Sequence, residues 1–110
     1  MKENLFVYGT LRPGHPNDQV LKNIGGSFEE GWVFGSLHNE GWGAEMGSPG
    51  IRLDANGEKV EGILFRSENL KNHWSVLDKF EGTAYRRVLT KVMLQNKTMA
   101  EAYIYELKPT

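Results

Sequence analysis

The chain has 110 residues, of which 39% are hydrophobic and 25% charged, and its formal net charge is −1. These values predict one globular domain over residues 1–110. The thirteen Lys and Arg residues are scattered, which argues against a nucleic-acid partner, and no apolar run is long enough for a membrane span or a signal peptide, so we expect a cytoplasmic protein.

The first half of the chain predicts short strands around one short helix. A continuous apolar run indicates a buried strand over residues 4–8. Residues 16–17 then offer a helix start, and Gly25 offers a stop. Aromatic and β-branched residues predict a bent strand over residues 28–37, and the glycine-rich residues 38–50 are typical of a loop.

The second half predicts two hairpins with one long helix between them. Turn signals flanked by apolar runs indicate hairpins over residues 51–66 and 86–107. The helix is expected over residues 67–82, with Ser67 as its N-cap and Gly82 just past its end. This order of elements predicts an α+β fold, a small mixed β-barrel of short strands flanked by helices.

Glu81 departs from the pattern of the long helix. On a helical wheel it falls in the middle of the apolar stripe formed by Leu70, Trp74 and Leu77. A carboxylate held at such a position loses hydration, which raises its pKa and suits a proton acceptor that works near neutral pH. The alternative is a structural ion pair, in which Arg86 or Arg87 reaches back to Glu81.

The stretch YGTLRPG, residues 8–14, places its glycines where the first strand ends. Gly9 allows a sharp backbone turn that exposes successive amides, and such a concavity attracts a carboxylate or phosphate. The stretch has neither the Lys-Ser/Thr ending of a P-loop nor a GxGxxG motif, so a nucleotide is not expected. The alternative is an ordinary β-turn at Pro13 and Gly14.

Other residues carry weaker signals. The chain has no cysteine, its three histidines lack metal-ligand spacing, and its serines lack a nucleophile-elbow context, so neither a metal nor a cofactor is predicted. Trp42, in its glycine-rich loop, is a candidate pocket residue. Tyr103 and Tyr105 lie close together on the last strand, and we expect one of them to face inward with a hydroxyl that needs a partner.

The ordered motifs VYGTLRPG, VEGILF and LDKFEGTAYRR resemble the γ-glutamylcyclotransferase-like family, in its short bacterial and AIG2-like branch. The resemblance runs from Leu5 to about Tyr105. It implies a small mixed β-barrel flanked by helices, with a pocket at one end. It also implies release of 5-oxoproline and a free amine from a γ-glutamyl amino acid or γ-glutamylamine by intramolecular cyclisation, without a cofactor.

The resemblance also implies roles for particular residues. In the family, a Tyr-Gly-(Ser/Thr)-Leu turn binds the γ-glutamyl group through backbone atoms, and a glutamate of the LDxxEG stretch is the general acid/base. The acid/base here would be Glu81, and Tyr105 is added as a substrate-binding candidate. The turn corresponds to Tyr8, Gly9, Thr10 and Leu11.

The sequence leaves several properties open. A Tyr-Pro stretch that helps to wall the family's pocket is replaced here by residues 38–51, so the leaving group is not determined. The oligomeric state is not determined either. The alternative to catalysis is a non-catalytic module that binds a small acidic metabolite in the same pocket.

Overall fold

Within residues 3–40 and 49–109, which the computed structural model describes, the chain forms six strands, two α-helices and a short 3-10 turn. The strands are β1 (Glu3–Val7), β2 (Ser27–His38), β3 (Gly50–Leu53), β4 (Glu58–Ser67), β5 (Tyr85–Leu94) and β6 (Met99–Leu107). The helical elements are α1 (Gln19–Ile24), the 3-10 turn η2 (Leu70–Asn72) and α2 (Trp74–Glu81).

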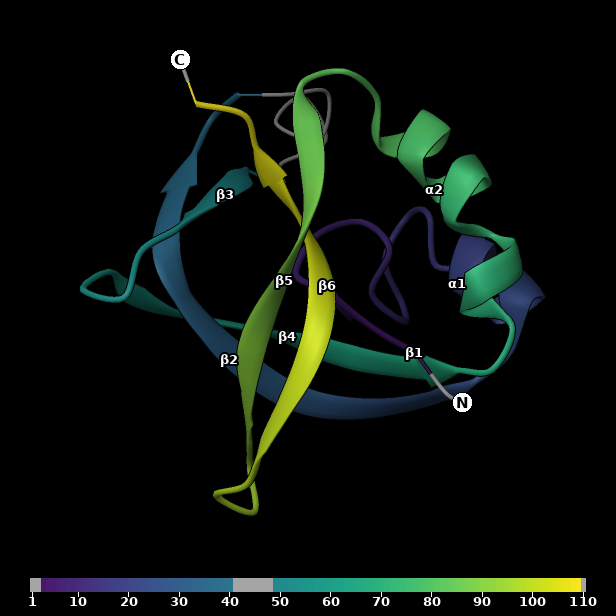
Figure 1. The fold of residues 1–110 in the computed structure, drawn as a ribbon, viewed down its shortest axis with the longest axis horizontal. Coiled ribbons are helices and arrows are strands. Elements are labelled where there is room, and N and C mark those ends of the chain that lie inside the picture. Colours follow the sequence, from purple (N-terminus) through teal and green to yellow (C-terminus); the bar gives the residue numbers. More distant parts are fainter. Residues whose placement is uncertain (1–2, 41–48, 110) are drawn as a thin grey trace.

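Five of these described strands close into a barrel (Figure 1). The sheet order is β3-β2-β4-β1-β6-β5, and a further pairing of β2 with β5 closes it. β1 runs parallel to β6, while the other paired strands are antiparallel, so the barrel is mixed. At the closure Gly31 faces Leu94, and a Cβ on Gly31 would come within 2.7 Å of the Met93 carbonyl oxygen. The predicted α+β barrel is confirmed.

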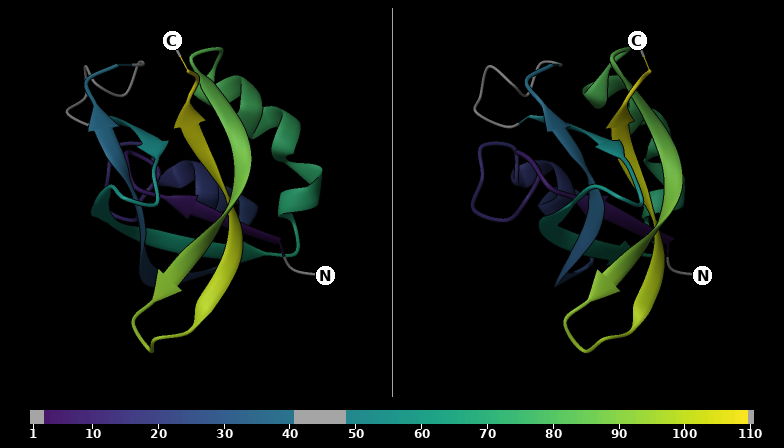
Figure 2. Two further views of the ribbon diagram at one scale, coloured as in Figure 1. Left: turned by 60° about the vertical axis from the view of Figure 1, so that its left-hand side comes forward. Right: turned by 90° about the vertical axis from the view of Figure 1, so that its left-hand side faces the viewer.

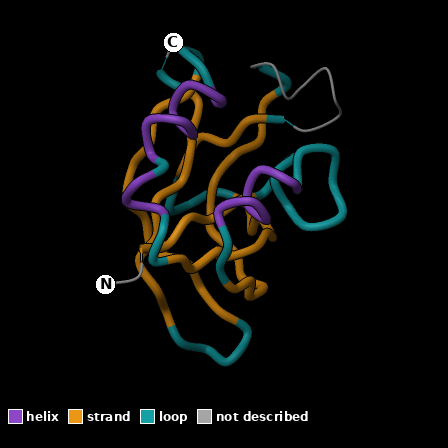
Figure 3. The backbone as a smooth tube through the Cα atoms, turned by 90° about the vertical axis from the view of Figure 1, so that its right-hand side faces the viewer, coloured by secondary structure: helices purple, strands orange, loops and turns teal. Residues whose placement is uncertain are grey.

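Two hydrophobic clusters organise the core. One includes Phe6 and Ile104 on the two parallel strands, together with Leu64 of β4. The other packs Leu21 of α1 and Leu77 of α2 against the barrel wall. Both helices therefore lie on the same side of the barrel (Figure 3). None of the helices in residues 3–40 and 49–109 has the length and apolar character that crossing a membrane would take.

The predicted hairpin over residues 51–66 is wrong. Residues 54–57 do form a tight turn, closed by a hydrogen bond from the Gly57 N–H to the Asp54 carbonyl oxygen (2.9 Å). However, β2 lies between β3 and β4 and pairs with both, so that Gly35 faces Leu53 on one side and Glu58 on the other. The length of β2, 12 residues, makes this double pairing possible.

The second predicted hairpin is confirmed. β5 and β6 pair in register from Tyr85 opposite Leu107 to Met93 opposite Met99. Their turn projects from the barrel at the end away from the C-terminus (Figure 2).

The long helix predicted over residues 67–82 begins later than expected. Ser67 is the last residue of β4, opposite Glu3 of β1, and its hydroxyl donates a hydrogen bond to the Gly25 carbonyl oxygen. Its oxygen also accepts a hydrogen bond from the Asn69 N–H (3.0 Å), but the α-helix starts only at Trp74, with His73 at its N-cap position, so Ser67 is not the N-cap of α2. Gly82 ends α2 with φ 87°, as predicted. The short helix α1 also starts late, at Gln19 with Asp18 at its N-cap position, and the Asn17 side chain bonds to Thr10.

Candidate active site

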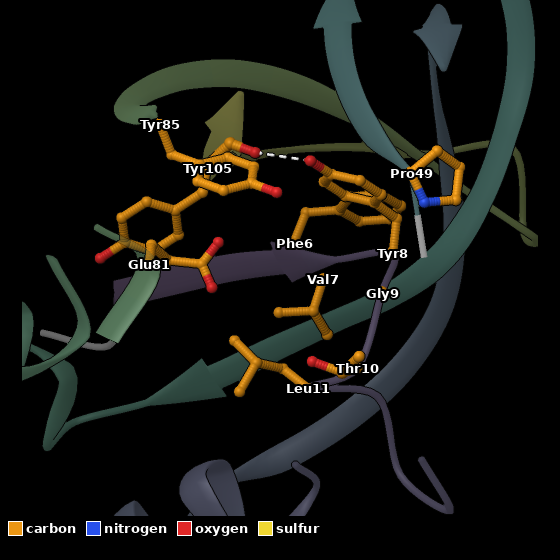
Figure 4. Close-up of a pocket in the computed structure, with 10 residues that line it drawn as sticks. All are labelled: Phe6, Val7, Tyr8, Gly9, Thr10, Leu11, Pro49, Glu81, Tyr85 and Tyr105. Atoms are coloured by element: carbon orange, nitrogen blue, oxygen red, sulfur yellow. Dashed lines mark hydrogen bonds between the residues drawn. The ribbon is translucent and has the colours of Figure 1, made fainter. Parts of the chain in front are cut away.

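A pocket opens where the end of β1 meets the end of α2. The volume inside it is about 40 Å³, and it rises to about 430 Å³ when the open solvent at its mouth is counted. The residues that line it are Phe6, Val7, Tyr8, Gly9, Thr10, Leu11, Pro49, Glu81, Tyr85 and Tyr105 (Figure 4). All six site residues predicted from the sequence are among them. Trp42 lies outside the described residues.

The turn after β1 is closely braced. The Thr10 carbonyl oxygen accepts a hydrogen bond from the Asn17 N–H (2.9 Å), and its Oγ1 accepts one from Asn17 Nδ2 (2.8 Å). The Gly9 carbonyl oxygen accepts hydrogen bonds from the backbone N–H of Arg12 (3.2 Å) and from its Nε (3.0 Å). These contacts fix the backbone of the turn at the pocket wall.

Three backbone amides of the braced turn have no acceptor within the part of the chain that the structure describes. The N–H groups of Gly9, Thr10 and Leu11 donate no hydrogen bond to any described residue. The β-turn alternative is also present, one step further along the chain. The His15 N–H donates to the Arg12 carbonyl oxygen (3.0 Å), and Gly14 supplies the left-handed residue with φ 82°. The two interpretations of YGTLRPG, an amide-bearing turn and a β-turn, therefore concern consecutive parts of one loop.

Tyr8 joins three strands at the pocket. Its hydroxyl donates to the Tyr105 carbonyl oxygen (2.8 Å) and accepts from the Ile51 N–H (3.0 Å). Burial raises the pKa of Tyr8 well above its ordinary value of 10.0, so the hydroxyl stays protonated at neutral pH. With these two hydrogen bonds made, Tyr8 acts as a brace for the pocket wall.

Tyr105 lines the pocket with its ring. Its hydroxyl donates to Asp78 Oδ1 (2.7 Å) on α2, and burial together with this hydrogen bond raises the pKa of Tyr105. The expectation that only one of Tyr103 and Tyr105 faces inward is wrong, because residues two apart on a strand share a face. Both tyrosines pack into the cluster beneath α2, and Tyr103 lies edge-on to Trp74 with ring centroids 5.0 Å apart.

Glu81 is the last residue of α2, and its side chain points into the pocket (Figure 4). The side chain is partly buried. Burial raises the pKa of Glu81 from 4.5 to about 7. Such a carboxyl group changes protonation state at neutral pH, which is the property required of a general acid/base.

Arg86 and Arg87, which the ion-pair alternative placed beside Glu81, form their ion pairs with other carboxylates. Arg86 pairs with Glu106 at 2.9 Å, and Arg87 pairs with Asp78 at 3.0 Å. The register of β5 and β6 explains the first pair, because it places Arg86 directly opposite Glu106. The second pair ties β5 to the exposed side of α2.

Sequence reasoning missed four lining residues: Phe6, Val7, Pro49 and Tyr85. Tyr85 is buried at the start of β5, four residues after Glu81, and Figure 4 shows its ring beside the space that Glu81 faces. Three of the four could have been found from the sequence. Phe6 and Val7 belong to the apolar run of β1, and Tyr85 belongs to the motif around Glu81. Pro49 precedes β3, which long-range contacts hold at the pocket: β3 pairs with β2, and its Ile51 N–H donates to the Tyr8 hydroxyl.

Comparison with known proteins places this fold and motif set in a family. The profile of the gamma-glutamyl cyclotransferase, AIG2-like family matches residues 5–110. The chain belongs to this family. No curated protein matches it.

This member of the gamma-glutamyl cyclotransferase, AIG2-like family is also similar to solved structures. An AIG2-like protein from Mus musculus is 25% identical with a TM-score of 0.71, over 96% of this chain and 76% of that one. YkqA from Bacillus subtilis is 26% identical with a TM-score of 0.73, and this whole chain covers only 37% of it. A structure described as a gamma-glutamyl cyclotransferase shares the fold, at 18% identity and a TM-score of 0.70, over 98% of this chain and 68% of that one.

Proposed function

We propose that the protein is a γ-glutamyl cyclotransferase, which releases 5-oxoproline and a free amine from a γ-glutamyl amino acid or γ-glutamylamine. One observation carries the proposal: a partly buried carboxyl group, on Glu81, has a pKa of about 7 and shares a pocket with the turn at Gly9–Leu11, whose N–H groups donate to no described residue. An acid/base and a set of hydrogen-bond donors are the two parts that this intramolecular reaction requires. Membership of the family supports the same reaction class.

The reaction needs no nucleophile from the protein, because the substrate carries its own. The α-nitrogen attacks the γ-carbonyl carbon, a new C–N bond closes the five-membered ring, and the original amide C–N bond breaks. Two protons move in all from the α-nitrogen to the leaving nitrogen, so an α-ammonium group and an amide become a ring amide and a free ammonium group. Ionised Glu81 takes the first proton and then returns it to the leaving nitrogen.

The turn would hold the anionic parts of the substrate. Three backbone N–H groups without acceptors in the described protein suit a carboxylate or the oxyanion of the tetrahedral intermediate. The apolar walls supplied by Val7, Leu11 and the Tyr105 ring limit the conformations of the methylene chain. Holding a chain in a ring-closing conformation lowers the barrier by up to about 7–11 kcal/mol.

The test is the formation of 5-oxoproline from a panel of γ-glutamyl compounds, with wild type and Glu81→Gln compared. We expect the variant to lose roughly 10²- to 10⁴-fold in kcat, the usual contribution of a general acid/base. The matched control is Glu68→Gln, which removes an exposed carboxylate outside the pocket and is expected to keep wild-type turnover.

Two outcomes would contradict the proposal. Equal turnover by Glu81→Gln and wild type would remove Glu81 from the mechanism. Binding of glutamate-like ligands with no product from any compound would favour the non-catalytic binding module.

A further inference from the structure

A second groove adjoins the candidate active site. Tyr8 and Pro49 line both spaces, so the groove and the pocket meet at these two side chains. We call it the outer groove, and its remaining walls are Arg12, Leu37, Lys59, Val60 and Glu61. A substrate whose γ-glutamyl part fills the pocket has a neighbouring surface here for the group that leaves.

Arg12 is held firmly in the outer groove. Its Nε donates to the Gly9 carbonyl oxygen at 3.0 Å, and its backbone N–H donates to the same oxygen at 3.2 Å. The guanidinium is therefore attached to the Gly9–Leu11 turn, which lines the pocket. Its position depends on the same backbone that would position the substrate, so little side-chain entropy remains to be lost when it binds a ligand.

The charge of Arg12 is not matched by the described protein. No carboxylate among residues 3–40 and 49–109 forms an ion pair with it, and its two terminal nitrogens donate no hydrogen bond there. Lys59 of the same groove differs, since its Nζ lies 3.8 Å from Glu61 Oε1 and 4.1 Å from the centre of the Trp32 ring. Of the two cations in the outer groove, Arg12 is therefore the one whose charge has no partner within the described residues.

We propose that Arg12 determines substrate specificity by binding a carboxylate on the leaving group. The preferred substrates are then γ-glutamyl amino acids, whose leaving amine carries an α-carboxylate, over γ-glutamylamines whose leaving amine carries none. This inference rests on the proposed cyclotransferase function and narrows its substrate class. A guanidinium has the planar donor geometry that a carboxylate accepts with two hydrogen bonds.

Two substrates that differ only in this carboxylate provide the test. γ-Glutamylalanine and γ-glutamylethylamide share the γ-glutamyl part and the scissile amide, and the second lacks only the alanine carboxylate. The measurement is the ratio of their kcat/KM values for 5-oxoproline formation. A ratio taken within one protein cancels any general damage that a substitution causes to the turn.

We expect wild type to prefer γ-glutamylalanine by roughly 10-fold or more, the usual effect of a hydrogen bond to a charged group. Arg12→Gln should bring the ratio close to one, and Arg12→Lys should keep part of the preference. The matched control is Lys91→Gln, which removes an exposed positive charge on β5 outside the outer groove and should leave the ratio as in wild type. Added salt should weaken the wild-type preference.

The alternative outcomes are distinguishable. A wild-type ratio near one, or an equal loss on both substrates in Arg12→Gln, overturns the role of Arg12 and leaves the cyclotransferase function standing. A change in the Lys91→Gln ratio equal to that in Arg12→Gln overturns it as well, because it would be an effect of net charge. No 5-oxoproline from either substrate overturns the proposed function and this inference together.

Discussion

Replacing Glu81 with glutamine is expected to stabilise the protein above neutral pH. The native pKa of Glu81, about 7, lies above its ordinary value of 4.5. Between these pH values the native state keeps a proton that the unfolded state releases. The stability of wild type therefore falls as the pH rises through this window, and the loss is complete above about 7. A glutamine has no proton to lose and escapes this penalty.

The size of the effect follows from the shift itself. A rise from 4.5 to about 7 corresponds to a free energy on the order of 3 kcal/mol. The difference in free energy of unfolding between Glu81→Gln and wild type should be near zero below pH 4.5 and should approach this value by pH 8.

Urea unfolding followed by tryptophan fluorescence, at intervals from pH 4 to pH 8, measures this difference. The m value should stay the same in both proteins, because the fold is unchanged. Glu68→Gln is the matched control and should give a curve parallel to that of wild type. Parallel curves for Glu81→Gln and wild type would refute the reasoning, and so would a glutamine variant that is less stable at pH 8.

Three further predictions concern the pocket and its supports. The kcat/KM for 5-oxoproline formation should rise with pH through an apparent pKa near 7, because the base form of Glu81 accepts the first proton; a rising limb near pH 4.5 would contradict this. Tyr105→Phe removes the hydrogen bond to Asp78 and should cost about 1 kcal/mol of stability in urea unfolding, with turnover within a few-fold of wild type; an intact stability would mean that this bond does not hold α2 to β6. Gly62→Ala would place a Cβ 2.4 Å from the Val7 carbonyl oxygen and should lower the free energy of unfolding by about 2 kcal/mol or more, and an unchanged urea midpoint would show that β1 and β4 can separate freely.

Local patterns predicted much of the site. The stripe on α2 placed Leu77 in the core, where it is fully buried, and marked Glu81 as a carboxylate on that face. The glycine after β1 indicated a sharp turn, and the Arg12 N–H does close a turn there onto the Gly9 carbonyl oxygen. These predictions succeeded because helical periodicity and backbone freedom depend on neighbouring residues alone. The substrate-binding and catalytic roles of these residues stay predictions.

Long-range pairing explains the errors. The residues of β3 and β4 are joined by a short turn, which favours a hairpin locally, yet the 12-residue β2 pairs with both of them. Ser67 has the character of an N-cap, but its pairing opposite Glu3 keeps it in β4. In each case hydrogen bonds to a distant strand decided the outcome over the local preference.

The sequence by itself determined where the chain turns and which faces of its elements are apolar, because steric and hydrophobic preferences act over a few residues. Only the tertiary structure decided which groups meet. The β5–β6 register put Arg86 opposite Glu106, and barrel closure brought the turn after β1 to the same pocket as Glu81. The physical reason is that charges and hydrogen-bonding groups find their partners through space, and closing the sheet sets those distances.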